Sequence, residues 1–177
     1  RLEADAVFET GLVIFAADHG ENFWEQGRAG HGGFHGPKVM DVPLAIAGVG
    51  VEVGQGGPAS LVDIASTLRA TAGLPARGVD LRRPPRRDRI VVAAGTYFQG
   101  YDRSARSLTE RVVVRGDPFG GPRYLRYNLV SDPDEEHALP VDPDHPLLAA
   151  ALAESQPIDG EVVLSENEAL KALGYVE

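Results

Sequence analysis

Two continuous apolar runs near the start of the chain predict buried strands. Residues 11–17, Gly-Leu-Val-Ile-Phe-Ala-Ala, contain β-branched and aromatic side chains with no polar interruption. Residues 42–48, Val-Pro-Leu-Ala-Ile-Ala-Gly, form a second run of the same kind. Uninterrupted apolar strands are typical of a parallel or mixed sheet that is covered on both faces by helices. The pattern therefore predicts an α/β fold for this part of the chain.

A helix and a third strand are predicted after these runs. The helix, over residues 61–72, has apolar positions at the i, i+3, i+4 and i+7 spacing, namely Leu61, Ile64, Ala65 and Leu68. Ser60 is expected to cap its start and Gly73 to end it. The arginine- and proline-rich residues 74–88 are expected to form an exposed linker, and the apolar run 89–94 the third strand.

The second half of the chain has a different pattern. Residues 111–115 and 124–130 alternate around a loop with Asp-Pro and Gly-Gly pairs, which predicts two antiparallel strands. Helices are expected at 146–155, capped by Asp144, and at 165–173, where Ser165 and Glu168 form a capping box. We therefore divide the chain into an α/β part, residues 1–98, and a small α+β subdomain, residues 99–177.

A glycine-rich segment follows the first predicted strand. Residues 20–36 contain six glycines and have neither helical nor strand periodicity, so we expect a long ordered loop. Loops of this length inside a compact domain are usually functional or disordered, and the aromatic content favours function. Its aromatic residues, Phe23, Trp24 and Phe34, are expected to anchor the loop on the core.

Composition limits the class of protein. The 177 residues carry a formal net charge of −9, which argues against a nucleic-acid partner. The absence of cysteine excludes a disulfide framework and a thiolate metal site within this sequence. No apolar run approaches the roughly 20 residues that span a bilayer. Because the sequence starts at Arg1 without a signal peptide, we expect its first residue to be a cut or processed end.

Asp18 and His19 are the main candidates for site chemistry. They lie at the carboxyl end of a buried strand, which is the edge where α/β sheets usually bind ligands. A carboxylate and an imidazole suit zinc, manganese or calcium, although the same pair is common in simple turns. His31 is a candidate metal ligand, general acid or donor to an anionic oxygen, with a solvated loop position as the alternative. Glu21 either orients His19 or caps the loop.

The remaining histidines and charge runs receive structural interpretations. His35 is expected to be a loop residue, and His137 and His145 to lie on the surface. The acidic stretch 132–136 is expected to form a solvated turn, because its proline and spacing do not fit a calcium-binding EF-hand loop.

Several motifs in order resemble the sulfatase family of the alkaline-phosphatase-like superfamily. The first three are Val-Ile-Phe-Ala-Ala-Asp-His-Gly-Glu at 13–21, Gly-His-Gly at 30–32 and Asp-Val-Pro-Leu-Ala-Ile-Ala-Gly at 41–48. The resemblance continues through Leu-Val-Asp-Ile-Ala-Ser-Thr-Leu at 61–68, Tyr-Asn-Leu-Val-Ser-Asp-Pro-Asp-Glu-Glu at 127–136 and the final Leu-Gly-Tyr-Val-Glu. It implies an alkaline-phosphatase-like mixed sheet flanked by helices, of which this chain holds a part, with a small antiparallel sheet and helices at the carboxyl end.

The resemblance also implies roles for the candidate residues. Asp18 and His19 would bind a divalent metal, with calcium favoured and manganese or zinc as alternatives. His31 would be a catalytic and substrate-binding residue that faces the anionic ester group or a second metal. The implied parent enzyme hydrolyses sulfate esters, its substrate is a small anionic ester, and export to the periplasm or the extracellular space is favoured.

One part of the family pattern is absent from the sequence. The family's nucleophile lies in a Cys/Ser-x-Pro-x-Arg motif of the amino-terminal half, and no such string occurs here. The resemblance therefore covers the carboxyl-terminal portion, and we expect the chain to be inactive without an amino-terminal portion of the same protein. The alternatives are a phosphoethanolamine or phosphoglycerol transferase, a phosphonate or phosphate monoester hydrolase, and a non-catalytic binding fragment.

Overall fold

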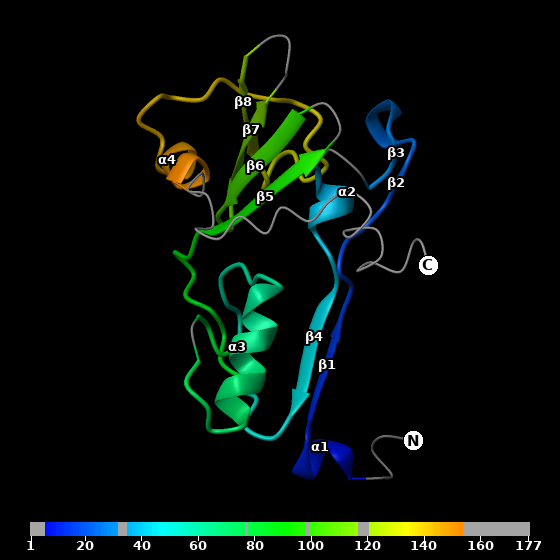
Figure 1. Ribbon diagram of the computed structural model, residues 1–177, viewed down its shortest axis with the longest axis vertical. Coiled ribbons are helices and arrows are strands. Elements are labelled where there is room, and N and C mark those ends of the chain that lie inside the picture. Colours follow the sequence, from blue (N-terminus) through cyan, green and yellow to red (C-terminus); the bar gives the residue numbers. More distant parts are fainter. Residues whose placement is uncertain (1–5, 32–34, 77, 98–99, 117–120, 154–177) are drawn as a thin grey trace, which may run out of the picture.

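The computed structural model describes residues 6–31, 35–76, 78–97, 100–116 and 121–153, and its elements form one small ribbon, one hairpin and one larger sheet (Figure 1). The elements are α1 (Val7–Thr10), β1 (Leu12–Ala16), β2 (Asn22–Phe23), the 3-10 helix η1 (Glu25–Gly27), β3 (Ala29–Gly30), α2 (Pro37–Met40), β4 (Leu44–Gly48), α3 (Val62–Thr71), β5 (Val91–Tyr97), β6 (Gly100–Arg106), β7 (Glu110–Gly116), β8 (Arg123–Asn128) and α4 (Pro146–Ala153).

The first two predicted strands are confirmed as β1 and β4, and they pair with each other. The pairing is antiparallel, with Ile14 opposite Ile46. Within the described residues the ribbon is not covered on both faces, since the Phe15 side chain is 63% exposed. The expectation of burial on both faces is therefore wrong for these residues. An apolar run indicates that a strand is stabilised by burial, but it does not identify the segment that covers the strand. The larger mixed sheet stays a prediction.

The third predicted strand, β5, belongs to another sheet. It pairs with β6 in a four-stranded antiparallel sheet of order β5-β6-β7-β8, at the opposite end of the molecule from α1 (Figure 1). The predicted antiparallel pair is confirmed as β7 and β8. β6 was not expected, because its inward-facing positions include Asp102 and Ser104 rather than apolar residues. Hydrophobic patterning cannot identify a strand that buries polar side chains.

Helix α4 packs on this sheet and completes the main apolar core. The core residues are Ala105, Val112, Val114, Leu147, Leu148 and Ala151. The helix begins as predicted, but its cap is His145 and not Asp144: the Leu147 N–H donates to His145 Nδ1 at 3.2 Å, and the Ala149 N–H to the His145 carbonyl at 3.1 Å. His145 is also half-buried beside Glu110, so its surface assignment is wrong. The helix predicted at 165–173 lies outside the described residues.

Polar contacts hold the start of α3. The Asp63 carboxylate accepts from the Ser60 N–H at 2.8 Å, so the predicted cap is reversed: a carboxylate in the first turn caps the Ser60 backbone. Arg89 donates to both Asp63 oxygens at 2.7 and 2.9 Å, and Asp63 is 1% exposed. The predicted apolar stripe is not the buried face, since Leu68 is exposed and Ser66 is buried. Within the described part of the chain, α3 packs through its polar side.

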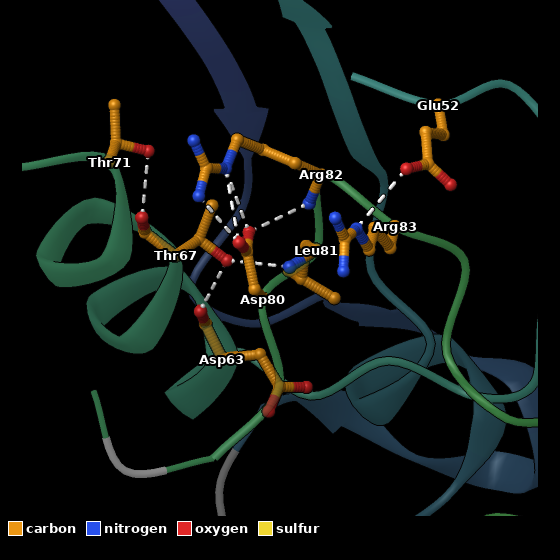
Figure 2. Close-up of polar contacts among 8 residues, drawn as sticks. All are labelled: Glu52, Asp63, Thr67, Thr71, Asp80, Leu81, Arg82 and Arg83. Carbon is orange, nitrogen blue, oxygen red and sulfur yellow. Dashed lines mark hydrogen bonds and ion pairs between the residues drawn. The ribbon is translucent and has the colours of Figure 1, made fainter. Parts of the chain in front are cut away.

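The segment after α3 is ordered and not a loose linker. Figure 2 shows Leu81 donating its backbone N–H to Thr67 Oγ1 at 2.8 Å, and Arg82 bridging to the Asp80 carboxylate. The Glu52 N–H donates to the Arg82 carbonyl at 2.7 Å, which ties the segment to residues 49–58. Arg83 and Arg86 are exposed as expected. Leu81, at 7% exposure, precedes them and anchors the segment on α3.

Candidate functional site

The end of β1 places Asp18 and His19 side by side. Asp18 Oδ1 accepts from the His19 backbone N–H at 2.9 Å, and Asp18 Oδ2 lies 3.7 Å from His19 Nε2. The first of these contacts is the main cause of a pKa for Asp18 below its usual value, so the carboxylate is ionised at neutral pH. His19 Nδ1 lies 2.9 Å from the Gly20 carbonyl, which can only accept, so this nitrogen carries the proton. In a neutral ring, Nε2 then presents its lone pair beside the Asp18 carboxylate.

Gly20 fixes this turn against α2. Its N–H donates to the Val39 carbonyl at 2.8 Å, and a Cβ at this position would lie 1.9 Å from the Lys38 carbonyl oxygen. No side chain fits such a gap, because real Cβ atoms do not approach backbone within 3.0 Å. The residue after the candidate pair must therefore be glycine for the turn to keep its position.

A short hairpin returns the chain to the same point. Strands β2 and β3 pair with Asn22 opposite Gly30, and this register places Glu21 beside His31. His31 Nδ1 lies 3.3 Å from Glu21 Oε2. Glu21 thus contacts His31, whereas the sequence interpretation had it either orienting His19 or capping the loop. The segment predicted as one loop without strands contains this hairpin, whose pairs are too few to give a periodic pattern.

The rings of His19 and His31 are stacked. Their centroids lie 4.1 Å apart and their planes are inclined by 24°. The two rings have different partners: His19 Nδ1 faces the Gly20 carbonyl and leaves Nε2 for a cation, while His31 Nδ1 faces the Glu21 carboxylate.

The pair Asp18 and His19 fits part of a metal site. One carboxylate oxygen and one unprotonated ring nitrogen, 3.7 Å apart, can contact the same cation. In the described ranges of the chain, no group of three or more His, Cys, Asp or Glu side chains is arranged to hold a metal ion. Further ligands would have to come from elsewhere.

The aromatic residues of the hairpin do not anchor it. Phe23 and Trp24 are 76% and 75% exposed, so their predicted packing on the core is wrong, and Phe34 lies outside the described residues. The anchoring side chain is instead Asn22, which is 6% exposed and donates to the Gly30 carbonyl at 3.1 Å. A polar side chain can anchor the hairpin because it forms a hydrogen bond with a backbone carbonyl of the opposite strand.

His35 holds the far end of the glycine-rich segment, a role that sequence reasoning missed. It is 9% exposed, its N–H donates to Asp102 Oδ2 at 3.0 Å, and its Nδ1 lies 3.1 Å from Ser104 Oγ. Burial lowers the pKa of His35. Arg115 donates to the same Asp102 carboxylate from the neighbouring strand, at 3.1 Å. The polar residues Asp102 and Ser104 of β6 are the sequence feature that could have indicated this role, because buried polar side chains need hydrogen-bond partners from another segment.

A second charged cluster joins α2 to the carboxyl-terminal sheet. Arg111, 2% exposed, contacts Asp41 at the end of α2 and lies 2.9 Å from Glu135 Oε1. Lys38 of α2 pairs with Asp134 at 2.8 Å. Burial raises the pKa of Glu135 to about 7 against the opposing effect of Arg111. The prediction of a solvated turn at 132–136 is therefore wrong for Glu135, which is 4% exposed.

No protein-family model matches the chain. The chain is 33% identical over 118 residues to the low-salt glycan biosynthesis sulfotransferase Agl7 of Haloferax volcanii. The matched region covers 61% of this chain and 29% of that protein.

Solved structures decide the fold. The chain superposes with a TM-score of 0.61 and 17% identity on yidJ of Bacteroides fragilis, provisionally described as a sulfatase, over 77% of this chain and 33% of that one. The chain has the fold of part of a sulfatase. BT4656, solved with its substrate D-glucosamine-2-N,6-O-disulfate, matches with a TM-score of 0.58 and 18% identity, over 77% of this chain and 31% of that one. The sulfatase resemblance of the motifs is thus confirmed at the level of fold, and the chain spans about a third of these relatives' length.

Among the residues that the structure describes, no helix is both long and apolar enough to cross a membrane. Export stays a prediction from the resemblance.

Proposed function

We propose that this chain is the carboxyl-terminal part of a metal-dependent hydrolase of sulfate esters. The observation that carries the proposal is the convergence of three side chains within a sulfatase-like fold. Asp18 and His19 lie at the end of β1, and His31 stacks on His19 at 4.1 Å. The expected catalytic and metal residues are thus brought to one place, although they are separated by a glycine-rich segment.

Asp18 and His19 would hold the divalent metal. The metal, when bound, supplies Lewis-acid polarisation of an ester oxygen. Calcium prefers oxygen ligands, so the imidazole in the pair favours manganese or zinc, whereas the family resemblance favours calcium. The proton on His19 Nδ1, fixed by the Gly20 carbonyl, keeps Nε2 ready to bind.

His31 would bind the anionic ester group. The Glu21 carboxylate, 3.3 Å from Nδ1, holds the ring in place, and Nε2 on its other side would donate to a sulfate oxygen. A donor placed there stabilises charge that develops on the ester in the transition state. Glu21 is accordingly a positioning residue for His31.

The ester group is proposed to be carried by a saccharide. Two comparisons support this class: the BT4656 structure contains a sulfated glucosamine, and the sequence relative is described as acting in glycan biosynthesis. The same relative favours a second candidate function, transfer of a sulfuryl group to a sugar acceptor in place of water, because it is described as a sulfotransferase. The two functions share the site and differ in the acceptor.

The attacking group and the other metal ligands are proposed to come from an amino-terminal portion of the same protein. The coverage of 29% to 34% of the relatives leaves room for it. The exposed apolar side chains of the β1–β4 ribbon, such as Phe15, are also consistent with a partner surface in the whole protein.

The proposal is tested by sulfate release from D-glucosamine 6-sulfate by the whole polypeptide that carries this sequence. We expect turnover that is lost with a chelator, restored by one of manganese, zinc or calcium, and reduced at least about a hundredfold by Asp18→Ala. His137→Ala, which removes an exposed histidine of another turn, serves as the control and should retain activity. Hydrolysis of a phosphate monoester in place of the sulfate ester, or activity that survives both chelation and Asp18→Ala, would contradict the proposal. Sulfate transfer to an added sugar without net release would identify the sulfotransferase.

A further inference from the structure

One face of the β2–β3 hairpin is open beside the proposed site. Side chains alternate between the two faces of a strand. Asn22 belongs to the inward face, because it is 6% exposed and bonds to Gly30 across the hairpin. Phe23, the next residue, belongs to the outward face and is 76% exposed. In Figure 1 the hairpin lies to the right of the carboxyl-terminal sheet, at the blue end of the colour range.

Phe23 shares the outward face with the two site residues of the hairpin. Glu21 precedes it by two positions, and His31 follows its cross-strand partner Ala29 by two positions. Two strand residues span roughly 6.5 Å, which is about the size of one monosaccharide. Because Ala29 has only a methyl group, it leaves the flank of the Phe23 ring open.

The turn beyond Phe23 is held in an uncommon conformation. Trp24 has a φ of 75°, in the left-handed region that non-glycine residues rarely adopt. Two backbone bonds maintain it, from Trp24 N–H to the Arg28 carbonyl at 2.8 Å and from Gly27 N–H to the Trp24 carbonyl at 3.1 Å. The Phe23 N–H also donates to the Glu25 carboxylate. Such strained positions often occur at ligand clamps, and here the turn fixes the backbone that carries Phe23.

We propose that Phe23 stacks on the sugar ring of the saccharide whose sulfate ester is held at His31. This inference rests on the proposed function and adds a residue that determines specificity. An aromatic face packs well on the C–H groups of a pyranose ring, and a rigid phenyl ring loses little conformational entropy on binding. The sulfate group would then lie at His31 and the ring that carries it along the hairpin.

The test compares a ligand that has a sugar ring with inorganic sulfate, which has none. In the whole, metal-loaded polypeptide, we measure KM for D-glucosamine 6-sulfate and the inhibition constant of inorganic sulfate. Phe23→Ala is expected to raise KM about three- to tenfold and to leave the sulfate constant within about twofold. Phe23→Tyr keeps the ring and should leave both constants unchanged, as should Val130→Ala, which removes an exposed apolar side chain of another turn.

The outcomes separate the inference from the proposed function. If Phe23→Ala changes both constants equally, or neither, the stacking inference is wrong and the hydrolase proposal stands; an equal change with lower stability would mean that the ring packs on another part of the protein. If the whole polypeptide shows no metal-dependent turnover of the sulfated sugar, both the proposed function and the inference are overturned.

Discussion

The rings of His19 and His31 are stacked although the two residues belong to different segments of the chain. The β2–β3 pairing places His31 next to Glu21, and the turn at Gly20 places His19 under it. The arrangement separates two chemical tasks, since His19 offers Nε2 to a cation while Glu21 holds the neighbouring ring of His31.

Removal of the His19 ring should abolish metal binding at the site. His19→Ala deletes Nε2, which lies 3.7 Å from Asp18 Oδ2, and leaves Asp18 as the one ligand that this turn supplies. We expect the affinity of the whole polypeptide for Mn²⁺ or Zn²⁺ to fall at least about a hundredfold in calorimetric titration. His137→Ala, whose imidazole is 80% exposed, is the control. Equal affinities of the two variants would show that His19 is not a ligand.

Gly20→Ala should displace the turn and destabilise the protein. The new methyl group would lie 1.9 Å from the Lys38 carbonyl oxygen, so α2 or the turn must move. We expect a loss of about 2–4 kcal/mol in urea unfolding, together with weaker metal binding. Gly27→Ala is the control, because its φ is 71° but nothing lies within 4 Å of the added methyl; it should cost about 1–2 kcal/mol. The account of the turn fails if the Gly27 variant is the less stable one.

Glu135→Gln should change how stability depends on pH. Burial raises the pKa of Glu135 from 4.5 to about 7, so folding favours its protonated form. The stabilisation is complete below pH 4.5 and is lost as the pH rises through 7. The Gln variant, which cannot ionise, should therefore gain stability relative to the natural protein between pH 5 and pH 8 in thermal unfolding. Glu136→Gln, at an exposed neighbour, should show no such change, and parallel pH profiles for all three proteins would contradict the assignment.

The buried pair of Asp63 and Arg89 should matter more for stability than the exposed pair nearby. Asp63→Ala leaves the Arg89 guanidinium, 19% exposed, without the carboxylate that it contacts through two nitrogens, and should cost about 3–5 kcal/mol. Asp88→Ala removes the partner of Arg86, whose side chain is 84% exposed, and should cost no more than about 1 kcal/mol. Denaturant unfolding of both variants measures the difference. Similar losses of unfolding free energy in the two variants would mean that the buried pair contributes no more to stability than the exposed pair.

Sequence patterning predicted the elements whose side chains are apolar. The runs at 11–17 and 42–48 became β1 and β4, and the alternation around residues 116–123 predicted the β7–β8 pair. It failed for β6, which buries Asp102 and Ser104, and for the packed side of α3, which is polar. In these elements the stabilising partners are side chains from distant segments, and periodicity carries no information about them.

The sequence indicated which residues form the candidate site, but not all the contacts between them. The Asp18 and His19 pair and the proximity of His31 followed from motif order and strand ends. The contact between Glu21 and His31 depends on the register of a hairpin with two pairs, which no pattern reveals. The exposure of Phe23 and the burial of His35 also differ from expectation, because each depends on which face of a short element is covered.

The most direct test of the central claim is to locate the metal. Crystals of the whole polypeptide grown with Mn²⁺ should give an anomalous difference peak about 2.0–2.4 Å from an Asp18 carboxylate oxygen and from His19 Nε2. The same peak should be absent from crystals of His19→Ala. A manganese peak at other residues, with Asp18 and His19 still in contact only with each other, would contradict the account.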